Sequence, residues 1–177
     1  MNSRAIQRDV EIVSSKRVGA YQHIVLNSPE IATYARPGNF VAISVGGPTS
    51  SMVLRRAFAI YRTTANQYVE LVVAPHGNGS KWLASQEAHS TINIVGPLGT
   101  SFGIPTEPAR VILVGGGYGS APLFGLAEIL KNRGCRVDMI LGASSAGKIY
   151  APLEGKRSVS SMTLTTDDGS AGEQGRV

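Results

Sequence analysis

One segment near the middle of the chain constrains the fold more than any other. Val111–Val114 is a short apolar run typical of a buried strand, and a glycine-rich turn follows at residues 115–120. Apolar residues then recur with helical spacing from Leu123 to Leu130. A strand, a glycine turn and a helix in this order place backbone N–H groups where a phosphate can bind. The alternative is a glycine turn that binds no ligand.

The turn departs from the usual dinucleotide-binding pattern. Gly115 and Gly117 fit G-x-G-x-x-[GA] only if Ser120 replaces the last small residue. Ser120 can also cap the helix that follows. Asp138 has the spacing of about 20 residues expected for a ribose-binding carboxylate, but it begins the next predicted strand. We therefore assign no residue to a ribose.

The first hundred residues have the composition of β-structure. The runs that predict strands are 10–13, 21–26, 40–45, 57–61, 68–73 and 91–95. Glycine and proline separate them, for example at Gly46-Gly47-Pro48. With only one short helix predicted, at 80–84, this even spacing is typical of a small antiparallel barrel or sandwich.

Four motifs carry a resemblance to a known superfamily. In chain order they are R-R-A-F-A-I at 55–60, G-N-G-S at 77–80, G-P-L-G-T-S-F at 96–102 and G-G-G-Y-G-S-A-P at 115–122. They resemble, in the same order, the motifs of the ferredoxin–NADP reductase superfamily. The resemblance implies an N-terminal antiparallel FAD-binding β-barrel over residues 1–103. It also implies an incomplete Rossmann-like parallel α/β domain over residues 109–177, which would bind NAD(P).

The same resemblance implies the residues that bind the cofactors. Arg56 would meet the flavin phosphate, the backbone from Ala57 to Ala59 would lie along the isoalloxazine, and Gly79-Ser80 would hold the pyrophosphate. The implied FAD-binding residues are Arg56, Ala57, Phe58, Ala59, Val72, Val73, Ala74, Gly79 and Ser80. The implied nucleotide-binding residues are Gly115, Gly116, Gly117, Gly119 and Ser120. No residue is implied as an acid–base catalyst or a metal ligand.

The chain departs from the superfamily at side chains that would contact FAD. Ala57 stands where relatives have proline, and Ala59 where they have a serine able to reach the flavin ring. Val73-Ala74 replaces a frequent Tyr-Arg pair. We therefore expect backbone contacts, Arg56 and the Gly79-Ser80 turn to carry more of the binding.

Within the superfamily, the C-terminal residues point to one group. Residues 165–177 resemble the T-D-D-G-S-x-G-x-x-G-x-V signature of dihydroorotate dehydrogenase electron-transfer subunits. This implies FAD-dependent electron transfer between a pyridine nucleotide and a catalytic subunit, in pyrimidine biosynthesis. A stand-alone NAD(P)H-dependent flavin or ferredoxin reductase and a non-catalytic flavin-binding module remain alternatives. Asp167 and Asp168 suit either a ligand-binding edge or a plain turn, and NADH is not distinguished from NADPH.

The nucleotide domain is expected to be incomplete. Three strands are predicted after Gly103, at 111–114, 136–141 and 162–165, whereas a doubly wound domain has about six. Relatives continue into a cysteine cluster for a 2Fe–2S centre, which Cys135 alone cannot ligate. Because an exposed parallel edge is a liability, we expect a fragment of a longer product, with a naturally shortened protein as the alternative.

Composition bears on partners and location. The net charge is +5, but basic residues are dispersed without interleaved aromatic residues, so we expect no nucleic-acid partner. No apolar run approaches the roughly 18 residues of a membrane helix, and the first residues lack a signal-peptide core. A single cysteine fits a cytoplasmic protein.

Overall fold

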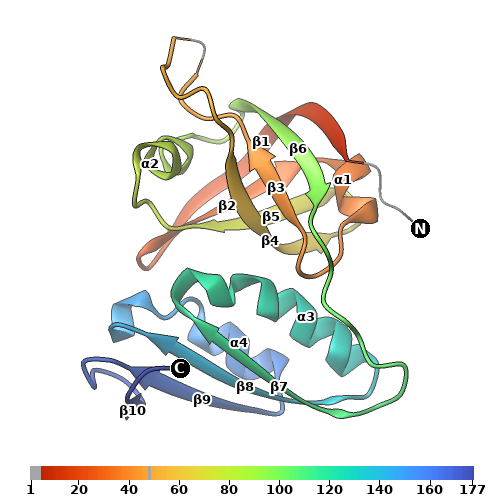
Figure 1. Ribbon diagram of the computed structural model, residues 1–177, viewed down its shortest axis with the longest axis vertical. Coiled ribbons are helices and arrows are strands. Elements are labelled where there is room, and N and C mark those ends of the chain that lie inside the picture. The colour runs from red at the N-terminus through yellow and green to blue at the C-terminus, as the bar shows by residue number, and fades with distance from the viewer. Residues whose placement is uncertain (1–4, 48) are drawn as a thin grey trace. The chain divides into compact units, whose positions relative to one another are not determined.

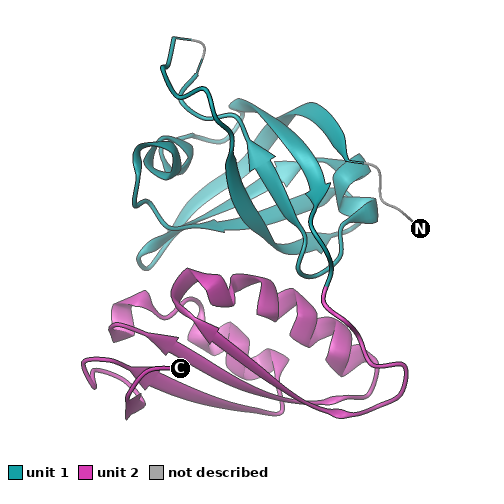
Figure 2. Cartoon of the chain, viewed as in Figure 1, with its two compact units in different colours: residues 1–101 teal, residues 102–177 magenta. Residues whose placement is uncertain are grey.

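The computed structural model describes residues 5–47 and 49–177, so the turn predicted at Pro48 lies partly outside the described residues. The chain divides into two compact units, residues 1–101 and 102–177 (Figure 2).

Unit 1 is a closed antiparallel barrel of six strands (Figure 1). The strands are β1 (Ile6–Val18), β2 (Tyr21–Asn27), β3 (Phe40–Ile43), β4 (Arg56–Thr64), β5 (Tyr68–Val73) and β6 (Thr91–Leu98). They are hydrogen-bonded in the order β1-β2-β5-β4-β3-β6, and β6 pairs with β1 to close the barrel. The predicted barrel is therefore confirmed.

Apolar residues that alternate along these strands fill the barrel. On β4, Ile60 is 3% exposed and Phe58 packs against the core, whereas Ala57 and Ala59 between them are exposed. This period of two is what a strand with one buried face requires. The buried core consists of Val10, Ile12, Ile24, Leu26, Ile31, Ala32, Ala35, Val41, Ile43, Val45, Ile60, Val69, Leu71, Val73, Leu83, Ile92 and Ile94.

The barrel contains a second helix that the sequence analysis missed. Besides the expected α2 (Asn78–Ala84), α1 (Pro29–Tyr34) lies between β2 and β3. Pro29 occupies its first turn, and Ile31 is completely buried. Proline after a serine, with an acidic residue next, is a helix-start signal. The expectation of a single helix was wrong because the apolar stretch is too short to show helical periodicity.

Unit 2 is a parallel sheet with helices, as predicted. Its elements are β7 (Arg110–Gly116), α3 (Ala121–Asn132), β8 (Arg136–Ala143), α4 (Pro152–Ser158), β9 (Ser161–Thr166) and β10 (Glu173–Gln174). Short 3-10 turns lie at Gly117–Ser120 and Ala146–Lys148. The sheet order is β10-β9-β8-β7. The prediction of three strands was one short, because the two residues of β10 form a strand only by pairing with β9.

Both helices of unit 2 pack on one face of its sheet. Phe124 of α3 meets Tyr150 edge to face, and a Cβ atom on Gly155 of α4 would lie 3.2 Å from the Phe124 ring. On β7, the side chains of Ile112 and Val114 alternate to the other face and are 62% and 53% exposed. The parallel sheet is thus covered by helices on one side.

The turn between α3 and β8 contains the single cysteine. Gly134 adopts a positive φ of 79°, which ends the helix in the manner typical of glycine. The next backbone N–H, of Cys135, donates to the carbonyl of Leu130 at 3.0 Å. The Cys135 side chain is 6% exposed, so its thiol is packed inside unit 2.

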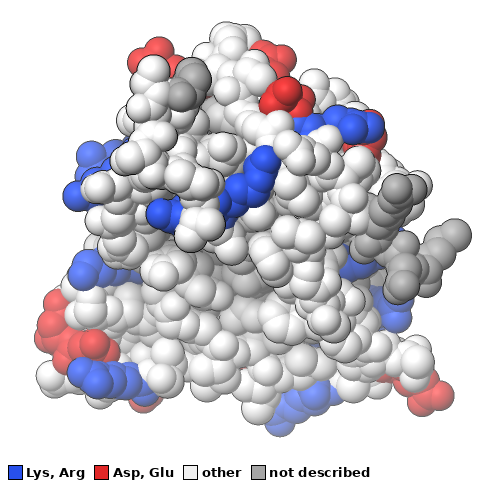
Figure 3. Space-filling model, turned by 45° about the horizontal axis from the view of Figure 1, so that its top comes forward, with Lys and Arg blue, Asp and Glu red and all other residues white. Residues whose placement is uncertain are grey.

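The surface carries its charges in separate groups. On the face that Figure 3 shows, lysine and arginine side chains form several small clusters rather than one continuous patch. Among the described residues, no helix is both long and apolar enough to cross a membrane.

Candidate functional site

The structure brings Arg56 and the Gly77–Ser80 turn together in unit 1. Arg56 begins β4, and the turn leads from β5 into α2. A Cβ atom on Gly79 would lie 3.0 Å from Cγ of Arg56 and 3.0 Å from a methyl group of Val45. Two motifs more than 20 residues apart in the sequence therefore meet, and the lack of a side chain at Gly79 lets them approach.

Ser80 organises the turn with its hydroxyl group. The Ser80 Oγ accepts hydrogen bonds from the backbone N–H of His76 at 3.0 Å and of Gly77 at 3.1 Å. The same hydroxyl donates to the Gly77 carbonyl at 3.1 Å. The first N–H groups of α2 have no acceptor within the helix. Ser80 thus shapes the loop, and the donors available to an anion are backbone N–H groups.

The outward face of β4 next to Arg56 is a small-residue surface. Ala57 and Ala59 are exposed, while Phe58 points toward the core. Two methyl groups leave the strand backbone open to a planar ligand. The adjoining guanidinium and glycine turn supply positive charge and N–H donors for a phosphate. These residues fit the isoalloxazine and pyrophosphate of FAD.

Neighbouring arginines at the start of β4 have different surroundings. Arg55 is half-buried, and its guanidinium donates to the carbonyl of Asn93 at 3.1 Å and to the Asn93 side-chain oxygen. Arg56 is exposed, and its Nη1 donates to the Leu54 carbonyl at 2.7 Å. Arg55 therefore ties β4 to β6, whereas the charge of Arg56 faces solvent beside Gly79.

The end of β5 offers no exposed side chain to a ligand. Val73 is completely buried in the barrel core, and Val72 and Ala74 are 7% and 8% exposed. All three were implied to be FAD-binding residues, and Val73-Ala74 stands where the superfamily often has a Tyr-Arg pair. Burial restricts any contact from this segment to the backbone.

In unit 2 the glycine turn brings the helix close to the end of β7. A Cβ atom on Gly115 would lie 2.7 Å from Leu123 and 2.9 Å from the Cα of Ser120. Gly117 has a positive φ of 54°, and a Cβ atom on it or on Gly119 would meet nothing within 4 Å. Gly115 thus serves packing, whereas the other two glycines leave open space.

Ser120 does not cap α3 as the sequence suggested. It stands at the N-cap position but has a helical backbone, with φ −73° and ψ −17°, and forms no side-chain cap hydrogen bond. Its hydroxyl donates to the Gly117 carbonyl at 2.7 Å, and the residue is 2% exposed. The 3-10 turn before α3 causes this difference, because a capping residue needs an extended backbone.

Glycines lie at the carboxyl ends of the two neighbouring strands β7 and β8. Gly116 of β7 and Gly142 of β8 are paired in register. Val177 lies against both, since a Cβ atom on Gly116 would be 3.4 Å and one on Gly142 would be 2.5 Å from the Val177 side chain.

Asp168 lies in the turn that follows β9. Its carboxylate accepts hydrogen bonds from the backbone N–H of Ser170 at 3.0 Å and from the Ser170 hydroxyl. The hydrogen bond from the Ser170 hydroxyl is the largest cause of the lowered pKa of Asp168. Because both hydrogen bonds lie within the turn, Asp168 acts as a turn residue.

Asp138 has a structural role at the opposite end of β8. It accepts hydrogen bonds from the Ser161 hydroxyl at 2.7 Å and from Nε of Arg110 at 2.8 Å. The Ser161 hydrogen bond, followed by that of Arg110, lowers the pKa of Asp138. Its carboxylate links β7, β8 and β9, and is therefore engaged within the sheet.

A buried carboxylate on the barrel wall was not predicted. Glu70 is 6% exposed and accepts from His23 at 2.9 Å, from Arg62 at 3.1 Å and from the Thr64 hydroxyl. Burial raises the pKa of Glu70, but the His23 and Thr64 hydrogen bonds and the charge of Arg62 outweigh it and lower the pKa to about 2. No sequence motif marks these residues, because they come from three different strands.

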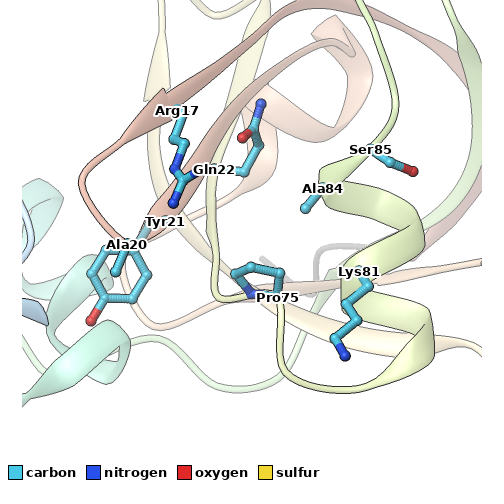
Figure 4. Close-up of a pocket in the computed structure, with 8 residues that line it drawn as sticks. All are labelled: Arg17, Ala20, Tyr21, Gln22, Pro75, Lys81, Ala84 and Ser85. Carbon is cyan, nitrogen blue, oxygen red and sulfur yellow. The ribbon is translucent and has the colours of Figure 1, made fainter.

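A pocket of about 290 Å³ lies between the β1–β2 hairpin and α2 (Figure 4). Its lining residues are Arg17, Ala20, Tyr21, Gln22, Pro75, Lys81, Ala84 and Ser85. Gln22 donates to Ser15 and Ser85 donates to the Trp82 carbonyl, so both polar groups are used internally. In Figure 4 the Lys81 ammonium points away from the Arg17 guanidinium. Because the polar groups do not converge, we assign this pocket no ligand.

The described residues contain no group of three or more His, Cys, Asp or Glu side chains that could hold a metal ion. The candidate site therefore consists of the Arg56–Gly79 cluster with the exposed face of β4 in unit 1, and the glycine turn in unit 2.

Comparisons with known proteins agree with this architecture. A closed antiparallel barrel followed by a parallel α/β unit is the fold of the ferredoxin–NADP reductase superfamily. The solved structure of an NADH-dependent reduced ferredoxin–NADP oxidoreductase, described in the context of flavin-based electron bifurcation, superposes with a TM-score of 0.82. It is 30% identical, and the match covers 94% of this chain and 59% of that one.

Curated sequences define the family. The electron transfer subunit of dihydroorotate dehydrogenase B (NAD(+)) from Desulforamulus reducens is 33% identical over 156 residues, covering 88% of this chain and 59% of that protein. The subunit of the same name from Bacillus caldolyticus is 31% identical over 177 residues, covering 97% and 68%. No protein-family model matches the chain. The chain belongs to the family of dihydroorotate dehydrogenase B electron transfer subunits, and it spans 59% to 68% of the length of these two relatives.

Proposed function

We propose that this chain binds FAD on unit 1 and transfers electrons between a pyridine nucleotide and a redox partner, as part of a dihydroorotate dehydrogenase. The observation that carries the proposal is the contact between Arg56 and Gly79 beside the exposed alanines of β4. It joins a phosphate-binding charge, a turn of N–H donors and a flat apolar surface within one unit. Family membership supports the same assignment.

FAD, when bound, supplies reversible two-electron chemistry with a nicotinamide and stepwise electron transfer to a partner. The residues of unit 1 bind and orient it. The Arg56 guanidinium neutralises phosphate charge, and the turn held by Ser80 presents backbone N–H groups. Ala57 and Ala59 leave the outer face of β4 accessible to the flavin ring. Because Ala59 has no hydroxyl, the ring receives no side-chain hydrogen bond from this position.

Unit 2 supports binding of the pyridine nucleotide. Gly117 and Gly119 leave open space at the carboxyl end of β7, where ligands of parallel α/β sheets bind. Gly115 permits the close packing of α3 on the strand that positions this turn. Hydride transfer to a flavin requires no side-chain acid or base, and none is assigned here.

The proposed redox partner is the catalytic subunit of a dihydroorotate dehydrogenase, acting in pyrimidine biosynthesis in the cytoplasm. A 2Fe–2S centre of the kind expected in full-length relatives needs thiolate ligands. Cys135, the single cysteine, is buried in unit 2. Thiolates from outside this sequence would therefore have to ligate such a centre.

A second candidate is a reductase that acts on ferredoxin or free flavin. The similarity to a ferredoxin–NADP oxidoreductase over 94% of the chain favours it. Steady-state assays with NADH or NADPH, and with ferredoxin, free flavin or the dihydroorotate dehydrogenase catalytic subunit as acceptor, separate the two functions. Turnover with ferredoxin or free flavin but not with the catalytic subunit would favour the second.

The test of FAD binding compares the two neighbouring arginines. FAD titration, followed by flavin fluorescence, should show that Arg56→Ala weakens binding by about 1.5–3 kcal/mol, the range for a charge-assisted hydrogen bond. Arg55→Ala is the matched control, since its guanidinium is engaged by Asn93. It should change FAD affinity much less, although it removes a link between β4 and β6.

Two outcomes would contradict the proposal. Purified protein that contains no flavin and takes up no added FAD would exclude a flavoprotein function. Equal losses of affinity in both arginine variants would show that Arg56 is not the phosphate ligand. Fluorescence of Trp82, the single tryptophan, verifies in each case that unit 1 is folded.

A further inference from the structure

Asn39 is a polar side chain buried at the start of β3. It is 5% exposed and directly precedes the strand. Its Oδ1 accepts a hydrogen bond from the backbone N–H of Arg36 at 2.8 Å, and its Nδ2 donates to the Gly99 carbonyl at 3.1 Å. Burying an amide is unfavourable unless its polar atoms are hydrogen-bonded, and here both are. The side chain thus fastens the start of β3 to the turn after β6.

The backbone of Asn39 also holds β4. Its carbonyl accepts from the backbone N–H of Ile60 at 3.0 Å, and its own N–H donates to the Arg36 carbonyl at 2.9 Å. Ile60 directly follows Ala59, the last of the residues expected to lie along the isoalloxazine. Asn39 therefore joins β3, the turn after β6 and the end of the flavin-facing segment of β4.

β3 is paired with the flavin-facing segment along its whole length (Figure 1). The register places Phe40 opposite Ala59 at one end and Ile43 opposite Arg56 at the other. Each residue from Arg56 to Ala59 thus has a partner on β3, and a shift of β3 along its axis would change all four pairs. The position of β3 therefore governs the position of the backbone that the flavin would meet.

The neighbouring ladders are irregular at the end where Asn39 lies. The pairing of β3 with β6 shifts between Phe40 and Ala42, and the pairing of β4 with β5 shifts between Ile60 and Arg62. An irregularity interrupts the ladder locally, so regular pairing fixes the register less firmly there. Asn39 precedes Phe40 and binds Ile60, and so adds fixed hydrogen bonds beside both shifts.

We propose that Asn39 is a positioning residue for the flavin. This inference rests on the proposed function, because it concerns the same segment of β4. By tying β3 to the turn after β6 and to Ile60, Asn39 sets the register in which Ala57–Ala59 present their backbone to the isoalloxazine. A segment that is held in place before the ligand arrives loses less conformational freedom on binding, so the affinity is higher. Asn39 acts through β3 and β4 and does not touch the ligand.

The experiment compares two substitutions at this position. Asn39→Ala removes both side-chain hydrogen bonds, whereas the isosteric Asn39→Asp still accepts from the Arg36 N–H but cannot donate to the Gly99 carbonyl. In an FAD titration followed by flavin fluorescence, both variants should bind about threefold to tenfold more weakly, because ordering of the strand would then oppose binding. At saturating FAD, the visible absorption spectrum of the bound flavin should also change, since the backbone along the ring is displaced.

Ile24→Val and Ile24→Ala are the matched controls. Ile24 is completely buried in the same barrel core, but it lies on β2, which is placed between β1 and β5 in the barrel order. The two substitutions lower the stability of the barrel by a smaller and a larger amount. Thermal unfolding followed by Trp82 fluorescence measures the stability of every variant. At temperatures where the barrel is folded, both controls should keep the FAD affinity and the flavin spectrum of the unsubstituted protein.

Three results would decide against the inference. Unchanged FAD affinity and an unchanged spectrum in the folded Asn39 variants would give Asn39 a purely structural role and leave the proposed function standing. A control of equal stability that loses as much FAD affinity as an Asn39 variant would trace the effect to stability alone. If the unsubstituted protein binds no FAD, both the inference and the proposed function fail. Should Asn39→Ala not fold, the isosteric Asn39→Asp decides between these results.

Discussion

Glu70→Gln isolates the contribution of the buried carboxylate on the barrel wall. The substitution preserves the shape of the side chain but removes the charge that faces His23 and Arg62. The folded barrel lowers the pKa of Glu70 from 4.5 to about 2. The folded state therefore favours the ionised form, and protonation must destabilise it.

The size of the effect follows from the pKa. The interval from 4.5 to about 2 corresponds to about 3 kcal/mol of folding stability, at about 1.4 kcal/mol per pH unit. A lowered pKa gives stability that is fully present above pH 4.5 and is lost as the pH falls through about 2. Glu70→Gln should therefore lower the unfolding free energy by about 3 kcal/mol at pH 7 and by little at pH 2.

Trp82 provides the assay, because it lies on α2 and packs partly buried against the barrel core. Urea unfolding followed by Trp82 fluorescence, at a series of pH values from 2 to 7, yields the stability of unit 1 in both proteins. The control is Glu30→Gln. Glu30 pairs with Arg8 at 3.0 Å, but both side chains are about half exposed, and such pairs contribute little.

Parallel pH profiles for the unsubstituted protein and Glu70→Gln would refute the reasoning. A loss in Glu30→Gln as large as that in Glu70→Gln would show that burial of the pair is irrelevant. Convergence of the Glu70→Gln and unsubstituted stabilities toward pH 2 is the expected signature.

Three further predictions concern unit 2. Gly115→Ala should destabilise it by about 1–3 kcal/mol, because the new methyl group would lie 2.7 Å from Leu123, whereas Gly119→Ala meets nothing within 4 Å and should be neutral. Phe124→Ala removes a completely buried ring and should cost about 3–5 kcal/mol. Chemical denaturation followed by circular dichroism tests these variants, and unsubstituted-like stability in Gly115→Ala or Phe124→Ala would contradict the packing described here. Because its hydrogen bonds lower the pKa of Asp138 from 3.8, Asp138→Asn should weaken the loss of stability on acidification below that pH. An unchanged acid profile of urea unfolding would refute this.

The fold was predictable where the sequence marks its own boundaries. Glycine and proline separate the barrel strands, so the even spacing of β-type runs indicates a small antiparallel barrel or sandwich, and the family resemblance favours the barrel. The strand–glycine turn–helix order at 111–130 likewise indicates a parallel α/β unit. Family resemblance implied that Arg56 and Gly79 each bind the phosphates of FAD, and the structure brings the two residues together.

Other features were not predictable because they depend on tertiary pairing. β10 is a strand only through its two residues beside Thr165 and Thr166, and no periodicity exists over two residues. The Ser120 backbone is set by the 3-10 turn before α3, which the glycine pattern does not specify. Glu70 is buried because His23 and Arg62 arrive from neighbouring strands, and a lone glutamate in a strand gives no sign of this.

Cys135 gives unit 2 a built-in reporter of its own opening. The Cys135 side chain is buried, and the residue lies between the Gly134 turn and the start of β8. A thiol-specific reagent reaches it when this part of unit 2 opens, so the labelling rate divided by the rate for an exposed cysteine reports local opening. With no second cysteine in the sequence, each labelling event has a single origin. The local opening of unit 2 can thus be followed by mass spectrometry without any engineered probe.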